Sequence, residues 1–402
     1  MKKYCLIFLC LVFFVLFPFI LSDNSNGVVY CDDEMSYSEI EEVIQENVNS
    51  QLGDLDFSDF EELLNQLGDD EKQFFGSASI IDKINQIISG EFANNQQSIW
   101  SAILNLIFDD VLSFLPLISV VIAISVTFSL VSSTKPTGKT NSLGDVIHFV
   151  CYGTIIIILV TCTVSMINLT SNTIQSIKAQ MDISFPILLT VMTAIGGMVS
   201  VGVYQPAVAV LSGTITNIFT AVLMPIFIFR LVFSIISNLS NNVKLEKFAS
   251  FFSSAFKWII GSVFTIFSAF LAIQGIIAGS VDGISFRTAK YAIKNTIPLL
   301  GSYISDGLNL IVASSVLIKN SVGACGLLLL FATIIVPVVK LVVFMFSLKL
   351  ASAILEPITD SRITNFISML AKSISLLIVI IIGCAFMYLL VCGMIMLSAN
   401  FF

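Results

Sequence analysis

A group of basic residues in the second half of this chain lies where the surrounding sequence is almost wholly apolar. Arg287, Lys290 and Lys294 are spaced i, i+3 and i+7, so on a helix they fall within roughly 60° of one another and form one cationic face. Such a face can rest on anionic lipid head groups, contact acidic partner surfaces or line a polar passage. The spacing leaves these interpretations open.

Glycines precede the cationic face at regular intervals. Gly275, Gly279 and Gly283 recur every four residues, the small-residue spacing that allows two helix backbones to approach closely in lipid. We therefore expect this segment to pack tightly against a neighbouring helix.

Four further charges lie near apolar runs. Arg230 and Lys340 interrupt long apolar stretches, and such residues either face the interior of a helix bundle or extend to the head groups from a tilted helix. Asp306 and Glu356 are expected to cap helices or to lie at the membrane interface, and Asp306 is a candidate contact to a partner or to lipid. Neither interpretation identifies a reaction.

Motifs of common enzyme classes are missing from the sequence. No G-x-x-x-x-G-K-[ST] loop occurs to bind nucleotide phosphates, and the single histidine, His148, excludes an H-E-x-x-H zinc site. No serine or aspartate constellation of an intramembrane protease is present. We predict no catalytic residues, no cofactor, no metal site and no nucleic-acid binding.

Composition identifies the class of protein that must position these residues. Of 402 residues, 56% are hydrophobic and 11% are charged, and the mean hydropathy is +0.96. Soluble proteins carry about twice this charged fraction. The chain is therefore predicted to be an integral membrane protein.

The N-terminal quarter differs from the rest in charge. Residues 1–22 have the pattern of a signal peptide, with an uncleaved anchor as the alternative. Residues 22–99 carry 18 acidic and two basic side chains, a net charge of −16, whereas the chain from residue 100 carries +6. Helical apolar spacing and an S-x-x-E box at Ser58 predict an acidic, exported domain of about three helices over 23–99.

Residues 100–402 are predicted to form a polytopic, all-α membrane domain. Apolar segments predict seven spans, at 111–131, 146–169, 183–204, 207–239, 259–281, 321–348 and 374–398. Residues 296–317 are either an eighth span or a re-entrant helix, because Pro298, Gly301 and Asp306 weaken this segment. The expected range is six to eight spans.

The orientation of the chain in the membrane depends on the number of spans. If the acidic domain is exported, Lys135 and Lys139 lie in the cytoplasm, as the positive-inside rule requires. Seven spans then place the cationic face inside but leave Lys244 and Lys247 outside, against the rule. The side of the carboxyl terminus therefore stays open.

The stretch 280–330, which begins SVDGISFRTAKYAIKNTIP, and the later run LEPITDS at 355–361 resemble the stage III sporulation protein AE family of endospore-forming bacteria. The resemblance covers most of the chain. It implies a multi-pass protein of the mother-cell membrane that surrounds the forespore.

The resemblance also implies a function. Members are viewed as permease-like or channel-associated subunits of a complex linking mother cell and forespore, with ring-forming subunits and a separate ATPase as partners. The alternatives are a stand-alone secondary transporter for a small solute and a non-conducting membrane scaffold. The family supplies no catalytic residues to assign here.

Overall fold

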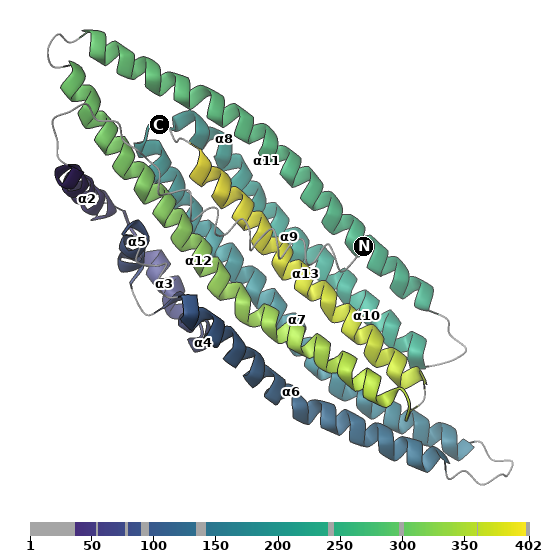
Figure 1. Ribbon diagram of the computed structural model, residues 1–402. Coiled ribbons are helices and arrows are strands. Elements are labelled where there is room, and N and C mark those ends of the chain that lie inside the picture. The colour runs from purple at the N-terminus through teal and green to yellow at the C-terminus, as the bar shows by residue number, and fades with distance from the viewer. Residues whose placement is uncertain are drawn as a thin grey trace.

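The fold was analysed in a computed structural model that describes residues 37–53, 55–76, 79–89, 96–133, 142–239, 245–296, 301–359 and 361–398 (Figure 1). Within these ranges every regular element is a helix, which confirms the all-α prediction. The predicted signal peptide at 1–22 lies outside the described residues.

Four helices precede the long apolar ones: α2 (Tyr37–Gly53), α3 (Ser58–Gln66), α4 (Asp69–Phe75) and α5 (Ile80–Ile88). The sequence predicted about three, because α4 (DDEKQFF) has too few apolar residues to show a helical period. Glu71 caps its start by accepting a hydrogen bond from the Gly68 N–H at 3.0 Å. The box expected at Ser58 does not form, since Phe57 is the N-cap of α3.

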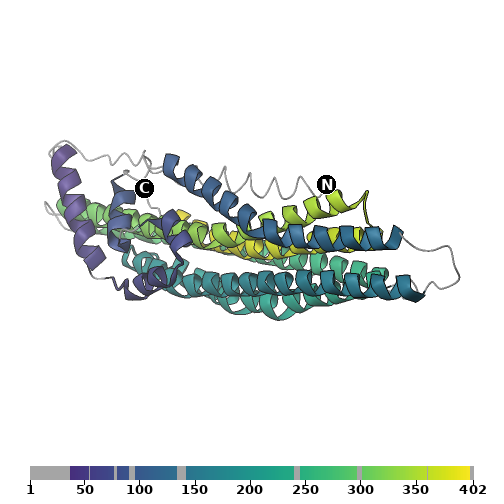
Figure 2. The same ribbon diagram turned by 90° about the horizontal axis from the view of Figure 1, so that it is seen from below.

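The N-terminal helices pack on the membrane domain and not only on one another. α2, α4 and α5 all contact α12 (Gly301–Leu355), and α2 runs across the long axis of the bundle (Figure 2). Their buried apolar side chains, among them Val48, Phe60 and Ile84, belong to the same core cluster as those of the long helices. Ser315 of α12 also donates a hydrogen bond to the Gln51 side chain at 2.7 Å. Helices α2, α4 and α5 are thus docked along α12, and α3 contacts α7.

The rest of the chain forms an elongated bundle of long helices. In chain order these are α6 (Gln96–Ser133), α7 (Ser142–Ala194), a third helical path made of several segments, α11 (Glu246–Thr296), α12 and α13 (Ser361–Leu397). Successive helices run in opposite directions (Figure 1). Six candidate spans are found in the described residues: Ser101–Leu130, Phe149–Ala194, Met198–Ser237, Lys247–Ile277, Gly307–Leu355 and Ser361–Leu397. The number lies at the lower end of the predicted range.

The seven-span assignment is wrong at residues 170–182, which were expected to link two spans. They lie inside α7, which ends in a turn at Ile195–Gly197 where Gly196 has φ 92°. Thr170 and Thr173 donate to the carbonyls of Met166 and Leu169, each at 2.8 Å. These side-chain bonds satisfy Thr170 and Thr173 within the helix, whereas Asn172, Gln175, Ser176 and Asp182 are exposed on its other faces.

Residues 301–317, the described part of the candidate eighth span, do not form a helix of their own. From Gly301 onward they are the first part of α12, a single helix of 55 residues. At 1.5 Å per residue α12 is about 80 Å long, more than twice the hydrocarbon thickness of a bilayer. Part of this helix must therefore lie outside the membrane.

The third path is α8 (Met198–Ala209), η3 (Val210–Ile215), α9 (Thr216–Ile218), η4 (Phe219–Leu223) and α10 (Met224–Leu239). η3 and η4 are π-helical, so their turns hold an extra residue. Phe219 in η4 is fully buried, and its ring would lie 3.3 Å from a Cβ placed on Gly383 of α13. The wide turns therefore fit against a glycine on the neighbouring helix.

Candidate functional site

A buried lysine joins three helices near the end of the bundle where α13 finishes. Lys319 of α12 is 0% exposed, and its Nζ donates a hydrogen bond to the Ser398 carbonyl just after α13. The Tyr204 hydroxyl of α8 shares a hydrogen bond of 2.6 Å with the Ser398 Oγ. A cation buried in an apolar bundle is costly unless it is hydrogen-bonded. Here Ser398 supplies the contact.

A second buried polar layer lies further along α12 and α13 and includes α7 in place of α8. Gln180 of α7 donates to the Thr333 hydroxyl of α12 at 2.5 Å. The backbone of Gly326 also comes close to the hydroxyl of Tyr388, since a Cβ added to this glycine would lie 2.9 Å from that oxygen and 3.5 Å from the Ser184 hydroxyl. We call the two layers together the polar seam: Gln180, Ser184, Tyr204, Lys319, Thr333, Tyr388 and Ser398.

The polar seam can fix the register of the helices. A shifted helix would break its hydrogen bonds, which join Gln180 to Thr333, Lys319 to Ser398 and Tyr204 to Ser398. The Ser184 and Tyr388 hydroxyls are buried without a hydrogen-bond partner among the described residues. Among the residues that the structure describes, no group of three or more His, Cys, Asp or Glu side chains is arranged to hold a metal ion.

Lys319 was missed by the sequence analysis. It falls between the segment 296–317 and the predicted span starting at residue 321, so it was assigned to a polar link. Its neighbours Ile318 and Val322 are nearly fully buried, as it is. The sequence does contain a sign of this position. Residues 301–355 can form one continuous helix, and a lysine within such a helix is a candidate buried charge.

A charged junction forms where α4, α6 and α12 meet, and we define it as Glu71, Asp110 and Lys340. Asp110 is 6% exposed, its Oδ2 has no hydrogen-bond partner among the described residues, and it lies within electrostatic reach of Lys340. Burial raises the pKa of Glu71, whereas its bond to the Gly68 N–H and the Lys340 charge act in the opposite direction. Phe74 packs beside the junction against the cluster that includes Leu106 and Val339.

The charged residues singled out in the sequence near apolar runs lie in different parts of the bundle. Lys340 is partly buried in the charged junction. Arg230 of α10 donates through Nη1 to the Lys372 carbonyl of α13 at 3.4 Å. Glu356 is exposed in the turn between α12 and α13. These residues therefore do not form one site.

The cationic face lies near the end of α11. Arg287 and Lys294 are exposed and Lys290 is partly exposed. Gly275, twelve residues before Arg287, faces α13, because a Cβ there would lie 2.6 Å from the Met394 Cε. Gly279, Gly283 and Asp306 lie where the structure describes the helix backbone alone, so their predicted contacts fall outside its description.

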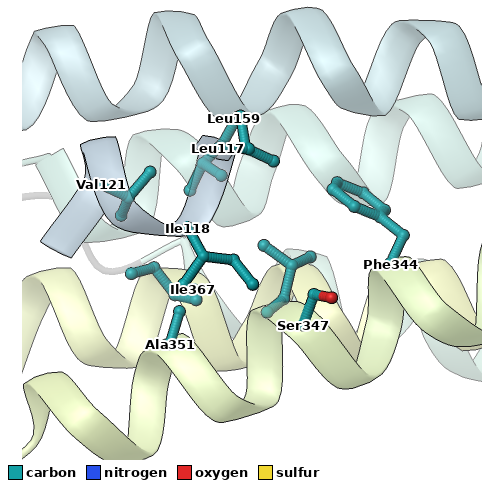
Figure 3. Close-up of a pocket in the computed structure, with 9 residues that line it drawn as sticks. Leu117, Ile118, Val121, Leu159, Phe344, Ser347, Ala351 and Ile367 are labelled. Carbon is teal, nitrogen blue, oxygen red and sulfur yellow. The ribbon is translucent and has the colours of Figure 1, made fainter. Parts of the chain in front are cut away.

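A small cavity lies between α6, α7, α12 and α13 (Figure 3). It is lined almost wholly by apolar side chains, including Ile118, Leu159, Phe344 and Ile367, and its volume is about 10 Å³. That volume is close to the minimum for one water molecule. An organic solute does not fit in it.

Comparison with known proteins agrees with this architecture. A model of the stage III sporulation protein AE family matches residues 78–399, from the start of α5 to the end of the bundle. The chain belongs to this family. Stage III sporulation protein AE of Bacillus subtilis (strain 168) is 25% identical over 289 residues, which cover 72% of this chain and 72% of that protein. No solved structure matches the chain.

Family membership and the fold together define the class of protein. It is a multi-pass helical membrane protein of sporulation. The family is a sporulation family and not a known enzyme family.

Proposed function

We propose that this chain is a membrane subunit of the multiprotein channel or secretion complex that links mother cell and forespore, and that it is required for spore development. The observation that carries the proposal is the family match over 78–399, which includes all six candidate spans. The protein acts without catalysis of its own. It works with ring-forming subunits and with an ATPase carried by a different chain.

Tight packing of the bundle supports a role as a subunit. Large side chains such as Phe185, Phe219 and Tyr388 are fully buried between helices, and the Phe185 and Tyr388 rings lie 5.1 Å apart. The cavity between α6, α7, α12 and α13, with a volume of about 10 Å³, is too small to hold a solute. A conduction path would then be formed between chains, with the apolar helix faces packing against partners.

The six-helix path supports an orientation in which the N-terminal helices are outside the cytoplasm. Figure 1 places the ends of α6, α10 and α12 and the starts of α7, α11 and α13 at one end of the bundle. Basic residues at or near these helix ends outnumber acidic ones: Lys135, Lys139, Lys244, Lys247, Lys349 and Arg362, against Asp145, Glu246, Glu356 and Asp360. The positive-inside rule assigns this end to the cytoplasm.

This orientation differs from the seven-span expectation. The end of α11, which carries the cationic face, the end of α13 and helix α2 lie toward the opposite end, and α4 lies near the middle of the bundle. Lys244 and Lys247 move inside, as the positive-inside rule requires, whereas Arg287, Lys290 and Lys294 move outside, against the rule. The membrane is that of the mother cell around the forespore.

The alternative is a stand-alone transporter, and one observation favours it. Lys319 is fully buried among apolar helices, and interior charges of this kind often mark ion or proton paths. Purified full-length protein in liposomes separates the two functions. A subunit moves no small solute by itself, whereas saturable uptake that depends on Lys319 would establish the transporter and overturn the proposal.

A further inference from the structure

Three neighbouring helices each carry a basic residue at nearly the same height along the bundle. Arg230 of α10 reaches α13, because its Nη1 donates to the Lys372 carbonyl at 3.4 Å. α10 also packs on α11, where the Phe229 and Phe252 rings are stacked with their centroids 5.6 Å apart. Lys257 lies five residues beyond Phe252 on α11, or about 7.5 Å. The three cations therefore lie within about two helical turns of one another along the bundle axis.

The sequence is uncharged on one side of each cation. All three uncharged runs extend away from the bundle end where α10 finishes and where α11 and α13 begin (Figure 1). Each run has at least 24 residues, or about 36 Å of helix, which is enough to cross the hydrocarbon of a bilayer. The runs are 198–229 before Arg230, 258–281 after Lys257 and 373–398 after Lys372. On this side of the bundle the cations thus mark the boundary between acyl chains and head groups.

Neither Arg230 nor Lys372 is paired with an acid in the part of the chain that the structure describes. The one bond that the Arg230 guanidinium makes there goes to a neutral carbonyl, and at 3.4 Å it is longer than the usual N–H···O range of roughly 2.7–3.2 Å. The Lys372 side chain is exposed. Two neighbouring positive charges repel each other unless an anion lies between them, and the remaining N–H donors of a guanidinium match the oxygens of a phosphate.

Exposed aromatic side chains flank the cations. Phe229, next to Arg230, is 52% exposed, and Trp258, next to Lys257, is 79% exposed. Arg230 itself is half-buried where α10 meets α13. Basic pockets between membrane helices bind the head groups of anionic lipids, and exposed aromatic rings favour the same interface. A phospholipid contacts both the cations and the rings, whereas a free anion contacts the cations alone.

We propose that Arg230 and Lys372 bind the phosphate of an anionic phospholipid where α10 meets α13, with Lys257 of α11 adding a third positive charge. Phosphatidylglycerol represents this class of ligand. Zwitterionic phosphatidylcholine carries a positive charge of its own, which the three cations repel. The inference concerns the chain and its lipid, so it does not rest on the proposed channel complex.

A tryptophan next to Arg230 can report which lipid occupies the site. The full-length chain has two tryptophans, so Trp100→Phe and Trp258→Phe combined with Phe229→Trp leave a single reporter, which can still stack on Phe252. The protein is reconstituted in vesicles of phosphatidylcholine and phosphatidylglycerol in which one lipid or the other carries bromine on its acyl chains. Bromine quenches tryptophan on contact, so the two quenching curves give the affinity for phosphatidylglycerol relative to phosphatidylcholine. A preference for phosphatidylglycerol is expected.

Removal of charge at the site should remove this preference. In Arg230→Gln with Lys372→Gln, the relative affinity is expected to fall about fivefold for each cation, or about 25-fold in total. Arg230→Lys keeps the charge and should retain most of the preference, which separates the effect from misfolding. The matched control is Arg287→Gln with Lys294→Gln, which removes the same two side-chain types about 50 Å or more further along α11 and should leave the relative affinity unchanged.

Equal quenching by the two brominated lipids in the reporter protein would overturn the inference. An unchanged relative affinity in the double variant would do the same, as would an equal loss in the matched control. Inorganic phosphate added at constant ionic strength should leave the relative affinity unchanged, and loss of the preference would assign the site to free phosphate instead. Absence of quenching by either lipid would show that protein covers the site, which also contradicts the proposal.

Discussion

The ammonium group of Lys319 donates a hydrogen bond to the backbone carbonyl of Ser398, although the two residues are 79 positions apart. The bond connects α12 with the residue that directly follows α13. Tyr204 contacts the Ser398 side chain from α8, so three helices meet at one serine. The stability of this end of the bundle should therefore depend on one buried side chain.

Substitution Lys319→Met keeps a long apolar side chain but removes the donor. The Ser398 carbonyl then loses its charged partner in a buried position, so unfolding free energy should fall by about 1–3 kcal/mol. Thermal unfolding in detergent, followed by circular dichroism, measures the loss. The matched control is Lys349→Met on the same helix, where the lysine is exposed. Equal stability of the two variants would contradict the role of Lys319.

Gly326 should not tolerate a methyl group. In Gly326→Ala the new Cβ would lie 2.9 Å from the hydroxyl of the fully buried Tyr388, so the two helices must move apart, at a cost of about 1–3 kcal/mol. Adding Tyr388→Phe removes the obstructing oxygen and should recover part of the loss. Gly393→Ala is the control, because nothing lies within 4 Å of a Cβ there. Thermal unfolding of the four proteins gives the comparison.

Asp110 and Lys340 should be energetically coupled. Asp110 is buried and Asp109 next to it is exposed, which provides a control at the adjacent position. A double-mutant cycle with Asp110→Asn and Lys340→Met should give a coupling of about 0.5–3 kcal/mol. The same cycle with Asp109→Asn should give a value near zero. Equal coupling energies in the two cycles would contradict a specific interaction between Lys340 and the buried carboxylate of Asp110.

Docking of α4 should depend on pH through Glu71. Burial raises the pKa of this carboxyl above its ordinary 4.5, so the docked state favours the protonated form. The stabilising contribution is fully present below pH 4.5 and is lost as the pH rises through the raised pKa. Glu71→Gln keeps an acceptor for the Gly68 N–H and should remove this dependence.

Limited proteolysis of the N-terminal helices at a series of pH values tests the effect, with acid- and base-tolerant proteases calibrated on an unfolded substrate. The wild type should become more susceptible than Glu71→Gln as the pH rises above 4.5. The exposed Glu62→Gln should behave like the wild type. A wild-type protein that becomes better protected than Glu71→Gln with rising pH would show that the sign is wrong.

Much of the fold follows from hydropathy, and its failures have physical causes. The apolar runs located the membrane helices, but the polar residues between 170 and 182 suggested a loop. Thr170 and Thr173 bond to their own helix and Gln180 bonds to Thr333 of α12, so these residues lie within one helix. A partner 153 residues away is not visible in a local sequence pattern.

The candidate site was predicted less completely than the fold. The spacing of Arg287, Lys290 and Lys294 and the close approach at Gly275 could be found from the sequence, because each is a local periodic feature. The polar seam could not, since Lys319, Tyr204 and Ser398 become neighbours through the packing of three helices. The charged junction also depends on α4, whose short sequence gave no helical signal.

The central claim is that this protein acts as a subunit of a larger sporulation complex. Affinity purification of the tagged full-length chain from membranes of sporulating cells, after mild cross-linking and with mass spectrometry of the captured proteins, tests this directly. The account predicts co-purification of other sporulation membrane proteins and of a separate ATPase, in amounts comparable to the tagged chain. Recovery of the tagged chain without any such partner, from cells that still sporulate normally, would contradict it.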